Sequence, residues 1–484
     1  MKFGIHLAAF LICATVVVGR AVADSAIDVH PSRVLAPVNA GVMGAGSDNW
    51  FNDTLSGLYQ SFLSSGITQT RYPGGSQADI YHWETGTDGP GACAGNANPK
   101  SNFDNFMQDV ALPADLAVAI TVNYGSNLEC TGGGDPSEAA SWVAYANATR
   151  YYAIQWWTVG NEQYTKGSVD LYSEHRDPAQ YAANEQAFYN AMHAASPTPI
   201  NVCVDGDPQN THNHWDEVVF SQARYDCVEL HYYPQHGRVD DEFLVDQAGP
   251  AITTFVNAAK TQLAAAGHPN APIYLGEIGS TTGPCGKQCQ SITQALYAGQ
   301  VIGELLNDNV ARATWHLAFT GCNPRGAGGD FRKSLYGWQD YGGAEIFSDD
   351  NPGGCKGDSA PLGTLVATAN AFQVASYFVR AGESMVGVSV DGSSNVRAYA
   401  STYLGGYALL IFNLDETNAV DATISIDGQA YGPGGTVATY DKKLYDYSRQ
   451  GVWSAPLVTS LPGWSGSLAV RLPAWSMTAV QVTP

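Results

Sequence analysis

Two short apolar stretches of the chain each end in glycine followed closely by glutamate. Residues 155–162 read Gln-Trp-Trp-Thr-Val-Gly-Asn-Glu, and residues 272–277 read Pro-Ile-Tyr-Leu-Gly-Glu. Runs of this length that are rich in β-branched and aromatic residues are typical of buried strands. A carboxylate at the end of such a strand has no evident packing role. Glu162 and Glu277 are therefore the first candidates for chemistry, and two carboxylates that face one cleft suit the hydrolysis of a glycosidic bond.

The two glutamates would have different roles in a retaining glycosidase. That reaction needs one carboxyl group to protonate the leaving oxygen and another, about 5–5.5 Å away, to attack the sugar. We expect Glu162 to be the general acid and base, which must hold a proton at the working pH. We expect Glu277 to be the nucleophile, which must stay ionised. The spacing between them leaves room for the intervening strands and helices that would place them on opposite sides of a barrel.

Other strand ends carry polar or aromatic side chains that could bind a substrate. Arg71 and Tyr233 would donate hydrogen bonds that keep Glu277 ionised. Asn161 would contact the sugar hydroxyl next to the reacting carbon, and Trp315 would form a stacking floor for the ring. The full set of candidates for substrate binding is Arg71, Asn123, Asn161, His231, Tyr233 and Trp315.

Most of these residues also have a purely structural explanation. Arg71 could form a structural salt bridge, and Asn123 could satisfy a carbonyl group at the end of its strand. Because a histidine in a strand is more often a satisfied core residue than a catalyst, we give His231 a supporting role only. Trp315 could belong to the barrel core. Glu229 lies two positions before His231, and we expect it to be paired outside the barrel.

The elements that would position these residues alternate along the chain between strand-like and helix-like patterns. Strands are expected at 38–43, 67–72, 116–122, 155–159, 200–204, 227–232, 273–277 and 313–319. Helices are expected at 55–63, 102–110, 137–147, 178–195, 215–221, 255–265, 291–307 and 365–378. This alternation predicts an α/β fold, a (β/α)₈ TIM barrel, in which the polar strand ends share one face. An open doubly wound sheet is disfavoured because no Gly-x-Gly-x-x-Gly motif follows the first strand.

The pattern changes near residue 381, where helical periodicity gives way to short alternating strands between Gly, Ser and Asn turns. This pattern predicts a C-terminal all-β sandwich, which we expect to be structural. The expected organisation is a signal peptide at 1–23, an N-terminal strand at 24–36 that joins the sandwich, a catalytic barrel at 37–379 and a sandwich at 380–484.

The N-terminus and the composition indicate an exported, soluble protein. Met1-Lys2 is followed by an apolar run and by Ala21-Val22-Ala23, which is the pattern of a secretory signal peptide and its cleavage site. No later stretch of the sequence is apolar enough to span a membrane. The formal net charge of −22 argues against nucleic acid as a partner. We expect no cofactor and no metal, and the partner would be an oligo- or polysaccharide; the sequence predicts no oligomeric state.

The cysteine count also fits an oxidising compartment. Nine cysteines are present, of which Cys13 lies in the signal peptide, so an even number remains and disulfides are expected. Connectivity does not follow from the sequence. The possible pairs include Cys203 with Cys227, Cys285 with Cys289, and Cys322 with Cys355.

Several motifs together resemble the clan-A retaining glycoside hydrolases. These are Asn-Glu at 161–162, Leu-Gly-Glu-Ile-Gly at 275–279 and His-Tyr-Tyr at 231–233. Arg-Tyr-Pro-Gly-Gly at 71–75, with Tyr81 and Trp83 downstream, resembles the α-L-arabinofuranosidase branch. So does Asn-Tyr-Gly at 123–125 followed by Glu-Ala-Ala-x-Trp-Val-x-Tyr at 138–145. The resemblance covers most of the chain, including a C-terminal sandwich, and it implies that Glu162 is the acid/base and Glu277 the nucleophile.

The resemblance does not single out one sugar. The β-glucuronidase and heparanase-like branch and the β-xylosidase branch share the same layout. Gln163-Tyr164 after the acid/base and the long loop at 321–354 depart from the arabinofuranosidase pattern. We expect a secreted retaining exo-glycosidase that removes side-chain sugars from plant or microbial polysaccharides, with an α-L-arabinofuranoside as first choice. The alternatives are a β-glucuronidase or β-xylosidase of the same clan, or a non-catalytic carbohydrate-binding protein.

Overall fold

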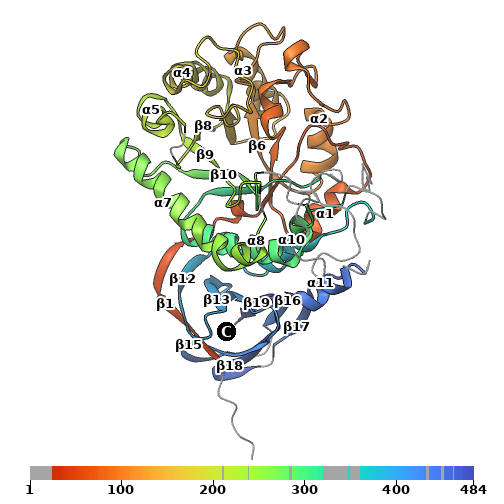
Figure 1. Cartoon of the computed structure of the whole chain (residues 1–484), viewed down its shortest axis with the longest axis vertical. Helices are drawn as coiled ribbons and strands as arrows, with labels where there is room; N and C mark the ends of the chain where they lie inside the picture. Colours follow the sequence, from red (N-terminus) through yellow and green to blue (C-terminus); the bar gives the residue numbers. More distant parts are fainter. Residues whose placement is uncertain are drawn as a thin grey trace, which may run out of the picture.

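Eight parallel strands close into a barrel that lies above a strongly curved, mainly antiparallel sheet (Figure 1). The computed structural model describes residues 24–209, 212–237, 239–282, 286–319, 346–348, 360–431, 435–448, 452–461 and 463–483. The barrel strands, in spatial order, are β2 (Gly44–Gly46), β3 (Gln69–Tyr72), β6 (Ala117–Val122), β7 (Trp156–Val159), β8 (Asn201–Gly206), β9 (Cys227–Tyr232), β10 (Ile273–Ile278) and β11 (Arg312–Trp315). The predicted TIM barrel is confirmed.

The first barrel strand lies later in the chain than its apolar pattern predicts. Residues 40–42 form a 3₁₀ turn, η1 (Ala40–Val42), and β2 is the small-residue run Gly-Ala-Gly. A Cβ atom on Gly44 would overlap the carbonyl oxygen of Ala313 and the side chain of Gln69. Strand β2 is therefore built from residues with almost no side chain, because its neighbours fill the space, and it gives no hydrophobic signal in the sequence.

The helices surround the barrel and lie in the segments that connect its strands. Aspartates cap three of the described helices: Asp135 accepts a hydrogen bond from the amide of Ser137, Asp177 from that of Gln180, and Asp240 from that of Phe243. The helices are α1 (Leu58–Ser65), α2 (Phe103–Asn105) with the π-helix η4 (Phe106–Ala111), α3 (Pro136–Val143) with the π-helix η5 (Ala144–Thr149), α4 (Pro178–Ala195), α5 (Trp215–Gln222), α6 (Asp241–Phe243) with the π-helix η6 (Leu244–Ala248), α7 (Gly249–Ala265), α8 (Ile292–Asn307) and α10 (Ala367–Ala375). Shorter elements are the 3₁₀ turns η2 (Ser76–Asp79), η3 (Gly91–Cys93) and η7 (Gly286–Gln290), and the hairpin of β4 (Tyr81–His82) and β5 (Thr87–Asp88).

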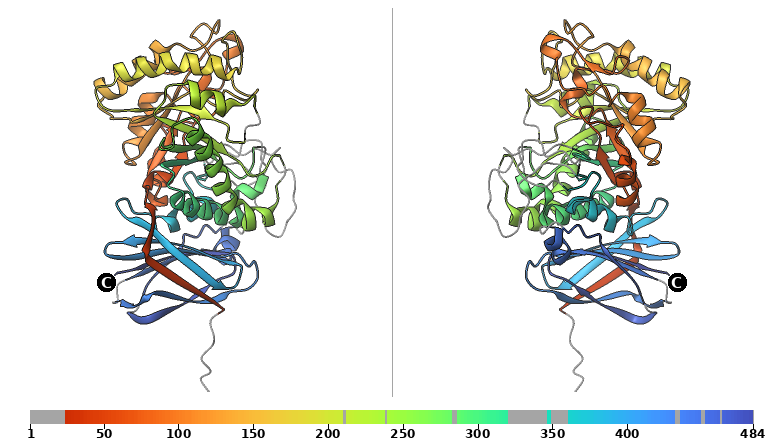
Figure 2. Two further views of the ribbon diagram at one scale, coloured as in Figure 1. Left: turned by 90° about the vertical axis from the view of Figure 1, so that its left-hand side faces the viewer. Right: turned by 90° about the vertical axis from the view of Figure 1, so that its right-hand side faces the viewer.

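The second sheet has nine strands and a core of its own. Its order is β17 (Leu457–Ser460), β16 (Thr436–Asp441), β19 (Ser476–Val482), β14 (Gly406–Asn413), β13 (Val396–Tyr403), β12 (Ser384–Gly392), β1 (Ser25–Pro37), β15 (Val420–Tyr431) and β18 (Trp464–Leu472). Figure 2 shows this sheet curving over itself below the barrel, which confirms the predicted sandwich. Strand β1 runs antiparallel to β12 and parallel to β15. The core between its two faces includes Ile27, Leu409, Ile411 and Ile424.

Helix α8 joins the barrel to the sandwich. It is buried on nearly all sides because it packs against α7 and α10 and also touches β14 and β19. A Cβ atom on Gly299 would overlap the sulfur of Met477, and one on Gly303 would overlap the ring of Tyr399. The two glycines therefore allow the sheet to approach the helix closely. A short helix of the sandwich, α11 (Lys442–Ser448), packs against β16.

Two disulfides join pairs of cysteines that both lie within the described ranges, and the sequence suggested one of these two. Cys203 and Cys227 are paired across the neighbouring strands β8 and β9, where they stand directly opposite each other. The second joins Cys93 to Cys130. The suggested pairs Cys285–Cys289 and Cys322–Cys355 each include at least one residue outside the described ranges. The predicted signal peptide and, apart from residues 346–348, the loop at 321–354 also lie outside these ranges. Within the described ranges no helix is both long and apolar enough to cross a membrane.

A substitution at Gly276 should show how tightly the barrel mouth is packed. In Gly276→Ala, the added Cβ would overlap the carboxylate of Glu229 on the neighbouring strand. We expect the free energy of unfolding, measured in urea, to fall by about 1–3 kcal/mol. Gly46→Ala is the matched control, because the nearest atoms to its Cβ would be 3.7 Å away. Equal effects of the two substitutions would contradict the packing described for Gly276.

Candidate active site

A cavity of about 570 Å³ opens at the carboxyl ends of the barrel strands, within the range of about 300–1,000 Å³ that is usual for ligand pockets. Loops that follow several different strands contribute to its wall. Its polar and aromatic lining includes Trp50, Asn161, Glu162, Tyr233, Glu277 and His316. The strand-end location agrees with the face on which TIM barrels build their sites.

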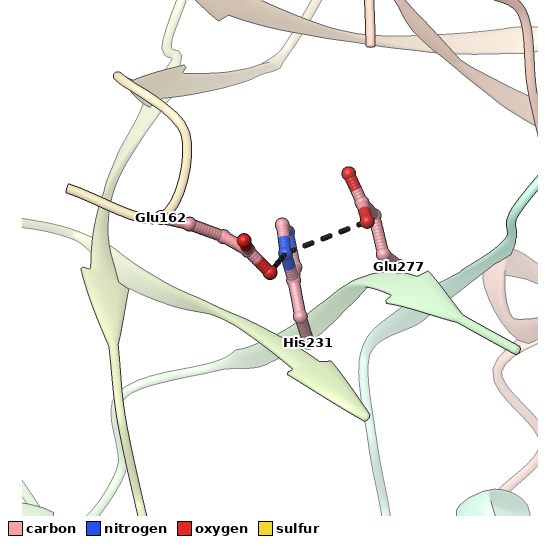
Figure 3. Close-up of side chains that lie close together, drawn as sticks. All are labelled: Glu162, His231 and Glu277. Carbon is pink, nitrogen blue, oxygen red and sulfur yellow. Dashed lines mark hydrogen bonds and ion pairs between the residues drawn. The ribbon is translucent and has the colours of Figure 1, made fainter. Parts of the chain in front are cut away.

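Glu162 and Glu277 both line this cavity and lie on either side of the His231 ring (Figure 3). One carboxylate oxygen of each lies within 4.8 Å of the other and of a ring nitrogen of His231. The backbone leaves β7 through Gly160 and Glu162, which have φ of 81° and 48°. This left-handed turn is unusual for a glutamate and is needed to direct its carboxylate into the cavity. The side chain of Glu162 is 27% exposed and that of Glu277 is 9% exposed.

Glu277 is held in its ionised form. Arg71 donates to its Oε1 at 3.0 Å, and the Tyr233 hydroxyl donates to its Oε2 at 2.6 Å. Burial opposes ionisation, but the charges of His231 and Arg71 and the Tyr233 bond bring the pKa of Glu277 well below its usual range. His316 also faces this carboxylate, but burial lowers the pKa of His316, so that ring is uncharged near neutral pH. The predicted partnership of Arg71 and Tyr233 with Glu277 is thus present in the structure.

His231 lies between the two glutamates and a third. Its Nδ1 is 2.8 Å from Oε1 of Glu162 and 3.7 Å from Oε2 of Glu277, and its Nε2 is 3.1 Å from Oε1 of Glu229. Burial alone would lower the pKa of His231, but the charge of Glu277 and the bonds to Glu162 and Glu229 raise this pKa to about 10. The ring is therefore a cation at neutral pH and donates from both nitrogens.

The prediction that Glu229 is paired outside the barrel is wrong. Its side chain is 1% exposed and lies inside the barrel mouth, 2.9 Å from the Arg71 guanidinium. Side chains two apart in a strand share a face, so Glu229 had to point to the same side as His231. The two-residue spacing between Glu229 and His231 was the sequence signal that could have placed Glu229 correctly. Space for the carboxylate comes from Gly276 on β10, which has no side chain.

Arg71 and Asn161 are linked in the same network. The guanidinium, which is 2% exposed, donates to the side-chain oxygen of Asn161 at 2.8 Å as well as to Glu277. Arg71 therefore fixes the orientation of the Asn161 amide, whose Oδ1 faces the arginine. Its structural and functional explanations are both correct in part, since one buried cation orients three side chains of the site.

Four of the six predicted binding residues, Arg71, Asn123, His231 and Trp315, are not among the described residues that line the cavity. Arg71 and His231 contact the glutamates of the site, whereas Asn123 and Trp315 have structural contacts instead. Asn123 accepts from the amide of Ser126 at 3.0 Å and donates to the carbonyl of Tyr81 at 3.2 Å, so it fixes loops. Trp315 is 2% exposed and packs edge-on against Tyr297, with ring centres 5.6 Å apart. The expectation of a stacking floor at Trp315 is therefore corrected, because the β11 strand turns this ring into the packing beneath α8.

Sequence reasoning missed two ring-bearing residues of the cavity. Trp50 follows β2, and His316 directly follows Trp315. Trp50 was overlooked because the first strand was placed too early in the chain, so that residue 50 did not stand near a strand end. An aromatic residue close behind a Gly-Ala-Gly strand was the signal that could have identified it.

The three residues Glu162, His231 and Glu277 are also compact enough to be considered as metal ligands. A metal would need a neutral imidazole with a free lone pair. His231 instead directs each nitrogen at a carboxylate, and its pKa is raised to about 10. Both nitrogens of His231 are therefore engaged by carboxylates in this structure.

Comparisons with known proteins rest on structure alone. The sequence matches no protein-family model and no curated protein. An α-L-arabinofuranosidase from Thermotoga maritima superposes with a TM-score of 0.71 at 16% identity, over 95% of this chain and 99% of that chain. A family 51 α-L-arabinofuranosidase from Bifidobacterium longum gives 0.69 at 17% identity, over 96% and 100%. A family 44 xyloglucanase from Paenibacillus polymyxa gives 0.65 at 12% identity, over 95% and 100%. The resemblance to clan-A enzymes is confirmed at the level of the fold.

The charge on His231 predicts a pH-dependent contribution to stability. A histidine in an unfolded chain titrates near about 6.5, whereas the pKa of His231 in the native state is about 10. Its stabilisation should be complete below pH 6.5 and lost as the pH rises toward 10. We therefore expect the difference in unfolding free energy between the protein and His231→Gln to shrink over this interval, by on the order of a few kcal/mol.

Urea unfolding at pH 6, 8 and 10 would measure this difference. His214→Gln is the control, because His214 is exposed on the surface and its loss should change stability little at any pH. A difference for His231→Gln that stays constant from pH 6 to 10 would contradict a charged ring in the native state.

Proposed function

We propose that this protein is a retaining glycoside hydrolase that works by double displacement. The observation that carries the proposal is the pair formed by Glu162 and Glu277, whose nearest described oxygens lie within 4.8 Å across one cavity. Retaining enzymes place their carboxyl groups about 5–5.5 Å apart, whereas inverting enzymes need about 6.5–9.5 Å to admit a water molecule between them. The close approach of the two groups favours direct attack on the sugar by one of them.

The charges of the cluster assign the roles. Two buried cations, Arg71 and His231, lie against Glu277 and Glu229 and can balance both of those carboxylates. Glu162 is the remaining acid and the most exposed of the three, so it is the group that exchanges a proton with substrate and water. Because His231 occupies Oε1 of Glu162, Oε2 is the oxygen that would face the leaving group.

The reaction then follows in two steps. In the first, an oxygen of Glu277 attacks the anomeric carbon while the glycosidic bond breaks and Glu162 gives its proton to the leaving oxygen. In the second, Glu162 takes a proton from water, whose oxygen attacks the same carbon and releases Glu277 as a carboxylate. Tyr233 and Arg71 donate to Glu277 before attack and again after release, so they stabilise the leaving carboxylate in the second step.

An α-L-arabinofuranoside is the proposed substrate class, on three grounds. The sequence motifs resemble that branch, the fold matches arabinofuranosidases among other clan-A enzymes, and none of the described residues that line the cavity is lysine or arginine. A described wall without lysine or arginine suits a neutral sugar better than a glucuronide, whose carboxylate needs donors. The disulfides Cys93–Cys130 and Cys203–Cys227 support export to an oxidising compartment, where polysaccharide would be met.

Removing the nucleophile should abolish turnover without unfolding the protein. For Glu277→Gln we expect kcat to fall by about 10⁴-fold or more, because the amide cannot form the glycosyl ester. In the unmodified protein, a 2-deoxy-2-fluoro glycoside should label Glu277 covalently. Mass spectrometry of a proteolytic digest would locate the label. Glu162→Ala tests the acid. We expect its kcat to fall by about 10²–10⁴-fold for substrates with poor leaving groups and by much less when the leaving group is dinitrophenolate.

Glu217→Gln, an exposed substitution, controls for the loss of a carboxylate as such. Unchanged turnover of Glu277→Gln, or a covalent label on another residue, would refute the mechanism. A folded protein that turns over no glycoside yet binds oligosaccharide would support the carbohydrate-binding alternative.

A panel of aryl glycosides tests the sugar. We expect 4-nitrophenyl α-L-arabinofuranoside to have a higher kcat/KM than the β-D-xyloside, the β-D-galactoside and the β-D-glucuronide, because the described cavity wall has no cation to pair with a carboxylate. Hydrolysis would be followed by release of nitrophenolate. Preference for the glucuronide would contradict the substrate class and leave the double-displacement mechanism intact.

A further inference from the structure

Glu229 is a third carboxylate at the barrel mouth for which double displacement has no use. Its side chain is 1% exposed, and it is not among the described residues that line the cavity. It therefore cannot touch a sugar. A buried carboxylate beneath two reacting ones adds negative charge where the nucleophile must itself be an anion, so its presence needs a physical reason.

The polar contacts of the Glu229 side chain with described residues are to Arg71, to His231 and to Thr158 of β7. Oε1 is 2.9 Å from Nη2 of Arg71 and 3.1 Å from Nε2 of His231, and Oε2 accepts from the hydroxyl of Thr158. Although burial opposes ionisation, the charges of Arg71 and His231 and these bonds lower the pKa of Glu229. An ionised Glu229 accepts hydrogen bonds only, so Nε2 of His231 must carry a proton.

That requirement reaches Glu162 through the imidazole ring. With Nε2 protonated and the ring charged, Nδ1 also carries a proton and donates it to Oε1 of Glu162 at 2.8 Å. We propose that Glu229 is a positioning residue for the acid/base: by keeping His231 doubly protonated, it occupies one oxygen of Glu162 and leaves the other free to serve the leaving group. This inference rests on the proposed function for its catalytic consequence, but not for the state of the ring.

The remaining groups around His231 do not replace Glu229 in this role. Glu277 faces Nδ1 at 3.7 Å and is engaged by Arg71 and Tyr233. Asp205 of β8 also faces the cluster, but burial raises its pKa well above the usual value and favours the neutral acid. Burial likewise favours the neutral form of His316. Glu229 is thus the described carboxylate that contacts Nε2.

Loss of the charge on Glu229 should redirect the proton of Glu162. In Glu229→Gln the amide oxygen can still accept from Nε2, but nothing then favours the doubly protonated ring. A neutral ring with its proton on Nε2 presents the Nδ1 lone pair to Glu162. The proton of Glu162 would then be donated to His231 instead of to the leaving oxygen. Such a defect weakens acid catalysis and leaves nucleophilic attack intact.

The state of the ring can be measured directly, whatever the substrate. Histidine-labelled protein would be titrated by ¹⁵N and ¹³C NMR, with the His231 signal assigned from its absence in His231→Gln. We expect His231 to stay doubly protonated at pH 7.5 in the unmodified protein and to deprotonate at least about one pH unit lower in Glu229→Gln. Glu217→Gln, which removes an exposed carboxylate 3.4 Å from His214, should leave the His231 signal unchanged.

A neutral His231 ring at pH 7.5 in the unmodified protein would overturn the proposal, even if Glu229→Gln did not fold. An unshifted titration in folded Glu229→Gln would overturn it as well. If the protein hydrolysed no glycoside at all, the proposed function would fail, while the NMR result would still decide the link between Glu229 and His231.

Kinetics separate positioning of Glu162 from a merely structural ion pair with Arg71. Glycosides of the sugar that the protein cleaves best would be compared with methanol and with dinitrophenolate as leaving groups. We expect kcat/KM of Glu229→Gln to fall at least about tenfold further for the poor leaving group, with the alkaline limb of its pH profile moved to lower pH. Equal losses for both leaving groups would mean that Glu229 acts through Arg71 on the nucleophile, and would overturn the proposal.

Discussion

The site depends on a charge balance that the barrel keeps away from water. Arg71 and His231 are nearly inaccessible to solvent, and each lies against more than one carboxylate. Removing any one of these partners would leave a buried charge unmatched, which costs far more than an exposed pair contributes. The geometry of Glu162 and Glu277 therefore follows from the network beneath them, and the network follows from residues placed on β3, β9 and β10.

The barrel makes that network possible because parallel strands present side chains in layers. Glu229 and His231 are two residues apart on β9, so one lies directly below the other. Gly276 on the neighbouring strand leaves the lower layer open, and Thr158 of β7 adds a donor. Small residues at the barrel mouth are thus as necessary to the electrostatics as the charged ones, since a single methyl group would occupy the volume that the carboxylate needs.

Much of the fold and part of the site followed from the sequence. Strand β9 was predicted to the residue, although Glu229 and His231 interrupt its apolar positions. Strand β2 was misplaced because it has no large side chain, and Trp50 was missed with it. The locations of Glu162 and Glu277 followed from their positions after strands. The positions of Trp315 and Glu229 did not, because only the packing of neighbouring strands decides whether a strand residue faces the cavity, the barrel interior or the helices.

The placement of β1 affects the order in which this molecule can be assembled. The segment from Ser25 to Pro37 is the first described part of the chain, yet it lies inside the second sheet between two strands that come more than 340 residues later. Contacts of such long separation form slowly, and an unpaired strand is prone to associate with other chains in the meantime. As the ribosome delivers the chain piece by piece, β1 cannot be paired on both sides until β15, which ends at Tyr431, has emerged, and the sheet is complete only with β19, which ends at Val482.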